Sequence, residues 1–249
     1  MKNFLSPSGS SRSRNIRQVF ALAIGVSALG VLSQPAQAVA IIDQAVFADG
    51  DITVSGPDAG INGDVHTNGN FNISGGSVVN GFTSAVGTVT NDTFNPGYLN
   101  GGSQSGAAVK SYPNMATVLG AIGMPYTEIT GNLIYSGSEI FSGVYWVHGF
   151  VDISSDAPGT ATFLADGNID ISGGANITSA VNNTSFPLGL ALYSGTGHVI
   201  VGDAKVAGSV AAKTNVDISG QTQVPEPSSA LLLSLGCVGA AIMRKRKKA

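Results

Sequence analysis

Short, nearly identical phrases recur along the middle of the chain, and this repetition constrains the fold more than any other feature. Residues 69–76 read GNFNISGG, residues 167–174 read GNIDISGG, and residues 215–220 read NVDISG. Equivalent positions return with a period of about 18 residues, as from Ile52 to Phe71, from Val151 to Ile169 and from Val199 to Val216. A unit that returns at this period predicts successive turns of a solenoid.

Within each copy, apolar and polar residues alternate, as in Val151-Asp152-Ile153. A period of two indicates a strand with one buried face. A strand of three or four residues cannot bury its apolar side alone, but stacking on neighbours about 4.8 Å away builds a continuous core. The Gly that follows Ser in these copies supplies the positive φ of a corner. We therefore predict an all-β fold, a right-handed parallel β-helix over residues 39–223, with an antiparallel β-sandwich as the alternative.

The repeat weakens between about residues 91 and 139. Ser111 is placed to cap a short helix, with Pro113 in its first turn, that runs to about Ala121. Nine of the 17 aromatic residues fall between Phe94 and Phe150. We expect this excursion to pack against the side or the end of the solenoid, because an uncovered terminal turn is an open sheet edge.

The charge distribution excludes one class of partner. Charged residues make up 11 % of the chain, and the part from Asp43 to Asp217 contains 14 acidic residues, three Lys and no Arg. A domain this acidic cannot neutralise phosphates, so nucleic-acid binding is excluded. With one Cys, the chain has no internal disulfide framework.

The N-terminus has the pattern of a secretory signal peptide, residues 1–38. Arg12, Arg14 and Arg17 precede an apolar run, residues 19–32, and the segment ends in Ala36-Gln37-Ala38. This small-x-small pattern predicts cleavage by signal peptidase after Ala38. The apolar run rises only about 21 Å as a helix, too short for a hydrocarbon core of about 30 Å.

The C-terminus, residues 224–249, has three parts in close succession. Val224-Pro225-Glu226-Pro227 is an extended segment, an apolar helix is expected over residues 230–243, and basic residues fill 244–248. The cluster that begins Arg244, Lys245, Arg246 would hold the end of a transmembrane helix on the cytoplasmic side.

This tail resembles the PEP-CTERM sorting signal of bacteria that make exopolysaccharide. The resemblance implies recognition of Pro225, Glu226 and Pro227 by an exosortase, a membrane protease, and delivery from the inner membrane to the cell surface or extracellular matrix. An ordinary tail anchor is the alternative. The exported part is also similar to the Gly/Asn-rich β-helical domains of bacterial envelope proteins, as in residues 63–70, GDVHTNGN. That similarity implies no particular activity.

Four groups of residues are candidates for catalysis or for binding a ligand. Stacked in register, Asp152 and Asp170, with Asp217 in the same row, would place carboxylates about 5 Å apart on an outer face, where they bind Ca²⁺ or form a solvated acidic surface. The acids Asp152, Asp156, Asp166 and Asp170 could also supply the paired carboxylates of a glycosidase. His66, His148 and His198 lie far apart along the chain and lack the spacing of a metal site.

Aromatic side chains form the fourth group of candidate residues. Tyr126, Tyr135, Tyr145 and Trp146 are candidate glycan contacts, although aromatic residues also pack an excursion onto its scaffold. The combined features predict a non-enzymatic protein of the cell surface or matrix, with no cofactor. We expect it to contact exopolysaccharide or copies of itself. A polysaccharide-modifying enzyme and a Ca²⁺-dependent surface module are the alternatives.

Overall fold

The chain forms a parallel β-solenoid in a computed structural model that describes residues 40–138 and 140–224. Within these residues every strand pairing is parallel except that of β18 (Val181–Asn183) with β19 (Phe186–Ser194). The prediction of a parallel β-helix is thus confirmed as a parallel solenoid, and the antiparallel sandwich is wrong. No helix in the described residues is long and apolar enough to cross a membrane. The predicted signal helix and C-terminal transmembrane helix lie outside those residues.

One side of the coil is an eight-stranded sheet, which we call the eight-stranded face. In spatial order its strands are β12 (Leu133–Tyr135), β14 (Val151–Ser154), β16 (Ile169–Ser172), β20 (Val199–Gly202), β23 (Val216–Ser219), β2 (Ile52–Ser55), β5 (Phe71–Ile73) and β8 (Val89–Asn91). The three repeat intervals found in the sequence each join direct neighbours in this sheet: Ile52 with Phe71, Val151 with Ile169, and Val199 with Val216.

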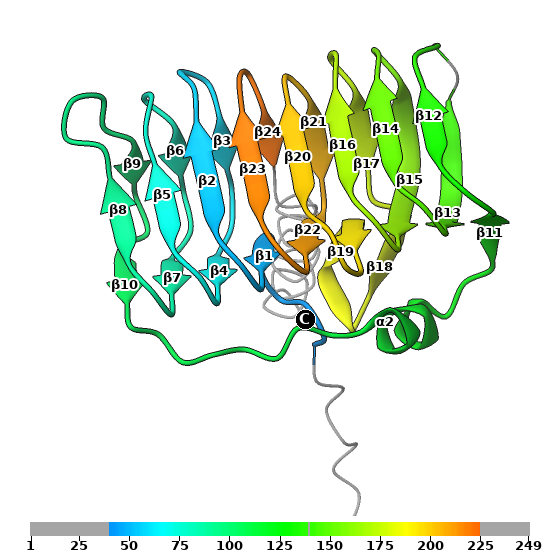
Figure 1. The fold of residues 1–249 in the computed structure, drawn as a ribbon, viewed down its shortest axis with the longest axis horizontal. Coiled ribbons are helices and arrows are strands. Elements are labelled where there is room, and N and C mark those ends of the chain that lie inside the picture. Colours follow the sequence, from blue (N-terminus) through cyan, green and yellow to red (C-terminus); the bar gives the residue numbers. More distant parts are fainter. Residues whose placement is uncertain (1–39, 139, 225–249) are drawn as a thin grey trace, which may run out of the picture. The chain divides into compact units, whose positions relative to one another are not determined.

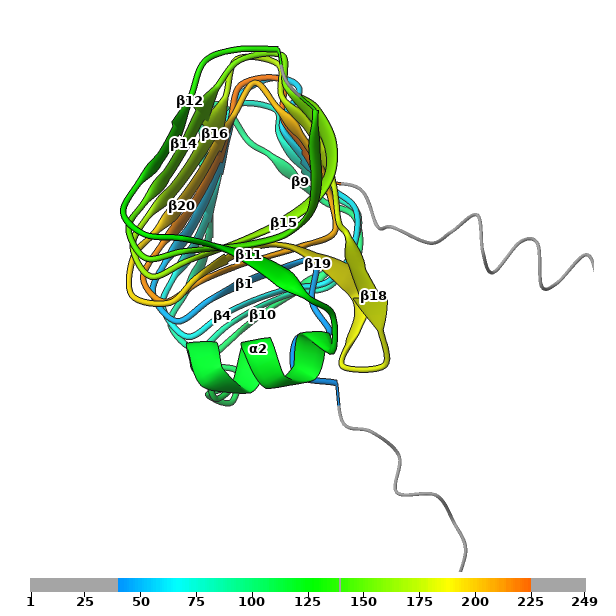
Figure 2. The ribbon, with the colours of Figure 1, turned by 90° about the vertical axis from the view of Figure 1, so that its right-hand side faces the viewer.

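The other strands form one sheet that bends into two further sides of the coil (Figure 2). The helix-covered face contains β10 (Ser103–Ser105), β7 (Thr83–Ala85), β4 (Val65–Thr67), β1 (Val46–Ala48), β22 (Ser209–Ala212), β19, β15 (Pro158–Ala165), β13 (Phe141–Val147) and β11 (Tyr126–Ile129). The short-strand face continues from the first half of β15 through β17 (Asn176–Thr178), β21 (Lys205–Ala207), β24 (Gln223–Val224), β3 (Gly60–Ile61), β6 (Val78–Val79) and β9 (Tyr98–Leu99).

The order of the strands in space differs from their order in the chain (Figure 1). The N-terminal strands β1 to β3 begin in the middle of the stack, and the chain proceeds from there to β8, β9 and β10 at one end. It then passes along the side and restarts at the opposite end with β11 and β12. The last turn returns to the middle, where β23 pairs with β2 and Thr53 aligns with Asp217.

The alternation of apolar and polar residues along the strands explains how the core forms. The inward residues of β14, β16 and β23, such as Val151, Ile169 and Ile218, are fully buried, whereas the intervening Asp152, Asp170 and Asp217 retain contact with solvent. Successive turns add inward residues to one continuous apolar cluster. No single strand forms this core, so each turn depends on its neighbours for burial.

Asn and Asp side chains join five of the seven pairs of neighbouring turns at the corner between the helix-covered and eight-stranded faces. Their carboxamide or carboxylate oxygens accept a hydrogen bond of 2.6–3.2 Å from a backbone N–H of the neighbouring turn: Asn132 from Phe150, Asn168 from His198, Asn215 from Asp51, Asp51 from Asn70 and Asn70 from Thr88. Gly precedes four of these five residues, all except Asn215, and it also precedes Phe150 at the same corner, for a steric reason. A Cβ on Gly69 would lie 2.3 Å from Asp51 Oδ1, and one on Gly149 would lie 2.1 Å from Asn132 Oδ1.

The excursion is shorter than predicted. Strands of the regular stack occupy both its ends, so only residues 106–125 lie between β10 and β11 without joining the stack. The segment contains α2 (Met115–Ile122), which is capped by Asn114 rather than Ser111: Asn114 Oδ1 accepts a hydrogen bond from Thr117 N at 2.9 Å. The capping role falls to Asn114 because the helix begins after Pro113.

Helix α2 packs on the side of the solenoid, over the helix-covered face (Figure 2). Its buried residues Val118 and Ile122 join a second apolar cluster with Leu164 and Tyr193, which point outward from the sheet. Asn183, in the β18–β19 hairpin, donates hydrogen bonds from Nδ2 to the carbonyls of Ala121 and Ile122 at the end of the helix. This hairpin also accounts for the longer stretch of chain between the paired strands β16 and β20.

Candidate functional site

The four aromatic residues singled out in the sequence lie in two different environments. Tyr135 and Tyr145 pack against the main core, where the Tyr145 ring is stacked on Phe163 at 5.4 Å and the Tyr135 ring meets Phe141 edge-on. Tyr126 and Trp146 lie on the outer side of the helix-covered face, with their ring centroids 5.7 Å apart in a T-shaped contact. Only this second pair is placed on an outer surface of the sheet.

Trp146 belongs to a polar group that we call the His148 cluster: Tyr126, Glu128, Trp146, His148 and Asp166. His148 Nε2 lies 2.6 Å from Glu128 Oε1, and His148 Nδ1 lies 3.0 Å from Asp166 Oδ2. Trp146 donates from Nε1 to Asp166 Oδ1 at 3.1 Å, and its ring centroid is 4.3 Å from that of His148. The cluster thus joins side chains from three neighbouring turns of the coil, beside β11, β13 and β15.

Two carboxylates determine the protonation of His148. A neutral imidazole has one N–H, so both ring nitrogens can donate only in the imidazolium form. The hydrogen bond to Glu128, followed by that to Asp166, raises the pKa of His148 above its ordinary value. The cluster therefore carries a cation between two anions at mildly acidic pH, and one of the two hydrogen bonds is lost when the proton leaves.

The exposed groups of the cluster determine what it can bind. Side-chain exposure is 56 % for Glu128 and 40 % for Asp166, and Tyr126 as a whole is 43 % exposed. Aromatic faces contact the C–H groups of sugars, and carboxylates accept hydrogen bonds from hydroxyls. A partly exposed aromatic pair bordered by two acids is therefore suited to an uncharged, hydroxyl-rich ligand.

The acidic row has the predicted register, with one interruption. Asp152 and Asp170 are direct partners in neighbouring strands β14 and β16. Asp217 lies two strands beyond Asp170, because Ile200 occupies the position between them. His198 lies beside the row, with its Nε2 3.4 Å from Asp170 Oδ1.

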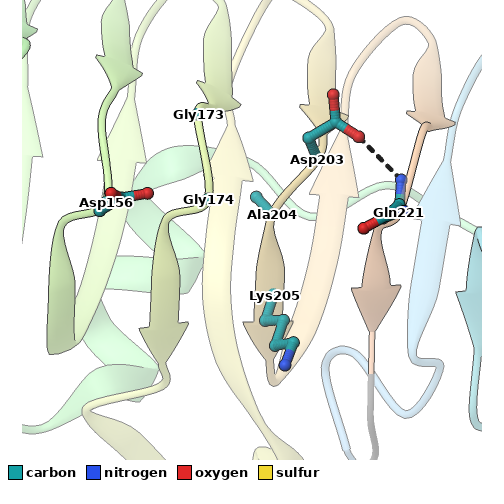
Figure 3. Close-up of a pocket in the computed structure, with 7 residues that line it drawn as sticks. All are labelled: Asp156, Gly173, Gly174, Asp203, Ala204, Lys205 and Gln221. Atoms are coloured by element: carbon teal, nitrogen blue, oxygen red, sulfur yellow. Dashed lines mark hydrogen bonds between the residues drawn. The ribbon is translucent and has the colours of Figure 1, made fainter.

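The other two candidate acids lie elsewhere. Asp166 belongs to the His148 cluster, and Asp156 lines a hollow of about 370 Å³ at the corner between the eight-stranded and short-strand faces (Figure 3). Asp203 and Lys205 line the same hollow. Asp203 Oδ1 accepts a hydrogen bond from Gln221 N at 2.8 Å, so this carboxylate stabilises the corner of the next turn.

The backbone conformation at position 203 explains why an Asp is found there. It adopts φ 52°, in a row of corner positions where other turns have Gly, such as Gly173 and Gly220 with φ of 70° and 67°. Asp tolerates this left-handed conformation better than most residues. The predicted use of Gly after Ser is confirmed at these two corners.

The histidines also have distinct surroundings. His66 is buried, with Nδ1 2.8 Å from Ser84 Oγ and Nε2 3.1 Å from Asn68 Oδ1, and burial lowers its pKa. It therefore serves the packing of the sheet. Within the described residues, no group of three or more His, Cys, Asp or Glu side chains is arranged to hold a metal ion. The alternative of Ca²⁺ binding by Asp152 and Asp170, beside a solvated acidic surface, stays a prediction.

Sequence reasoning missed the His148 cluster because it compared the histidines with each other. The useful signal was the repeat period, since Glu128 precedes His148, and Asp166 follows it, by close to one period. At that period, residues on the same side of the coil become neighbours. The processing residues Ala36 and Ala38 and the sorting residues Pro225, Glu226, Pro227, Arg244, Lys245 and Arg246 lie outside the described part of the chain.

Comparison with known proteins adds no relative. No protein-family model matches the chain, and neither a curated protein nor a solved structure matches it.

The pKa of His148 gives a pH-dependent prediction. Because the folded pKa is raised above the unfolded value of about 6.5, the cluster contributes its full stabilisation below that pH and loses it as pH rises through the folded pKa. We expect Glu128→Gln to bring the pKa of His148 back toward its ordinary value, as followed by NMR titration of the ring. Asp170→Asn, on a different face, is the control and should leave the titration unchanged. An unshifted His148 in the original chain would contradict the cluster.

Proposed function

We propose that the chain is exported, sorted at its C-terminus by an exosortase, and acts at the cell surface or in the extracellular matrix as a structural and adhesive protein without enzymatic activity. The observation that carries the proposal is where the described strands lie. Among the described residues, the first strand begins at Val46, shortly after Ala38, and the last strand, β24, includes Val224, the residue before Pro225. Cleavage at both predicted sites would therefore leave every described strand in place.

The physical character of the solenoid supports a role outside the cell. Each turn satisfies its backbone by hydrogen bonds to the next, and the Asn and Asp side chains at the corners add further links. Such a scaffold keeps its shape through links between neighbouring turns. We take the coil to be right-handed, as crossover connections between parallel strands almost always are.

The adhesive part of the proposal is assigned to the His148 cluster. Tyr126 offers a partly exposed ring, and Trp146 is fixed beside it through Asp166. Glu128 and Asp166 offer acceptors for sugar hydroxyls. An uncharged region of an exopolysaccharide fits this surface better than an anionic one, because the two nearest ionised groups besides His148 are carboxylates.

Sorting is tested with proline variants in the native host. We expect the recovered protein to begin near Val39 and end near the Pro-Glu-Pro motif, as measured by intact mass, and to be found at the surface or in the matrix. Pro225→Ala with Pro227→Ala should leave the folded domain unchanged but block cleavage and retain the protein in the inner membrane. Normal processing of this double variant would contradict recognition of the motif by an exosortase. A native species that keeps Arg244 and stays in the inner membrane would instead show an ordinary tail anchor.

Glycan contact is tested with a matched pair of aromatic variants. Tyr126→Ala should weaken binding to the host's exopolysaccharide about 5- to 20-fold, which corresponds to about 1–2 kcal/mol for one aromatic contact. Phe82→Ala is the control, because Phe82 is 42 % exposed but far from the cluster along the stack. Equal binding by the two variants in a glycan pull-down or array would contradict the assignment.

A further inference from the structure

Both ends of the solenoid terminate in strands that have a neighbour on one side only. At the β8 end these are β8, β9 and β10, and at the β12 end they are β11 and β12. Helix α2 packs along the side, so it covers neither end of the eight-stranded face (Figure 1). Within the described residues, each end therefore presents backbone N–H and C=O groups without a strand partner.

The free groups can be identified from the register. In a parallel strand, successive residues direct their N–H and C=O to opposite sides. Leu133 N donates to Phe150 O, toward β14, so the N–H of Ile134 points to the free edge. Thr83 N donates to Gly102 O, so the N–H of Ser103 in β10 points away from β7 and to the other free edge.

Exposed apolar side chains gather at the same two ends. Of the large apolar residues that are exposed in the described part of the chain, only Ile200 belongs to the middle of the stack. Seven of the others lie in the outermost two turns or in segments joined to them: Phe82, Phe94 and Tyr98 at the β8 end, and Met124, Tyr126, Ile134 and Ile140 at the β12 end. Val109 lies in the crossing segment along the side, next to Lys110, whose N–H donates to Asn68 Oδ1. Phe94 is 99 % exposed and Ile140 is 74 % exposed.

The core is incompletely covered at these places, although at the β8 end Asn91 and Gly97 bond to each other beside Ile73. Inward residues in the middle of the stack, such as Val151 and Ile169, are fully buried. Their counterparts in the terminal strands, Leu133 and Val89, are only partly buried, because one neighbouring turn is missing. A further turn of the same kind at either end would complete the burial of these two side chains.

The terminal strands are protected against edge pairing mainly by their shortness, and in β8 by a hydrogen bond of 2.9 Å from Val89 N to Ser105 Oγ. Proteins also protect free edges with Lys, Pro or inward-facing charges. Strands β8 to β12 have none of these, and Glu128 in β11 is their only charged residue. The edges are thus able to accept a strand from another molecule.

We propose that this domain assembles head to tail, the β8 end of one copy stacking on the β12 end of the next. A second copy is the partner that fits, because it provides parallel strands in the same direction, with the same spacing and the same three-sided arrangement as an internal turn. The two joined surfaces differ, so the contact is heterologous and the assembly grows as an open fibre. Assembly of this kind is a property of the folded solenoid and does not depend on the sorting or glycan contact proposed above.

The test uses the full chain in a mild detergent, so that any association through its termini is common to all variants. Sedimentation velocity and electron microscopy should show fibres that lengthen with protein concentration. Their axial repeat should be about 40 Å, the rise of eight strands about 4.8 Å apart. A wild-type protein that remains monomeric at about 100 µM, where weak specific contacts of this size would be populated, would overturn the proposal.

Edge variants locate the contact. Ile134→Pro and Ser103→Pro each remove one free N–H, at the β12 end and the β8 end, and remove no hydrogen bond to the neighbouring strand of the same chain. Each variant alone should remain monomeric, whereas an equimolar mixture should give dimers, because each supplies the end that the other lacks. Ile134→Val, which keeps the N–H, should assemble as wild type. Thermal unfolding by circular dichroism verifies that the proline variants are folded.

The mixture also tests the head-to-tail order. Fibres from either proline variant would show that these edges are not the contact. Dimers formed by one variant alone would show pairing of like ends. Either result contradicts the proposal.

Discussion

Hydrogen bonding between neighbouring turns is the constraint on which the rest of this structure depends. A strand of three residues has no stability of its own, and its inward side chains are buried only when turns lie on both sides. The Asn and Asp residues at the corners extend this dependence, since Asn70 both donates to Asp51 and accepts from Thr88. Whatever supplies the next turn, the same chain or another one, is therefore the main determinant of stability.

This constraint explains how the strands can stack in an order that differs from their order in the chain. Turn-to-turn contacts require similar strands at the right spacing but do not require that neighbouring turns be consecutive in the chain. The last turn can thus pair β23 with β2, although Asp217 and Thr53 lie near opposite ends of the described chain. Residues 106–125 make the rearrangement possible by crossing the helix-covered face, where α2 replaces solvent over Leu164 and Tyr193.

Much of the local structure could be predicted from the sequence, because it depends on patterns within one repeat. Alternation identified Ile169 and Ile171 as inward and Asp170 as outward, and the repeat period placed Asp152 beside Asp170. The spatial order could not be predicted, because several turns have the same sequence pattern and the pattern does not say which of them lies beside β2. The His148 cluster was missed for a related reason: its members are neighbours only across turns, and a histidine considered along the chain has no visible partners.

The most direct test of the central claim is a disulfide between the first and last turns. Thr53→Cys with Asp217→Cys, in a Cys237→Ser background, places two outward thiols on partner positions of β2 and β23, within the Cα separation of about 4.4–6.8 Å that a disulfide requires. Thr53→Cys with Asp170→Cys is the control, because two strands, β20 and β23, lie between those positions. The structure predicts that dilute oxidation joins Cys at 53 and 217 within one chain, as identified by peptide mass, and leaves the control pair reduced. A folded protein that does not form the 53–217 bond, or forms both bonds equally, would contradict the rearranged stack.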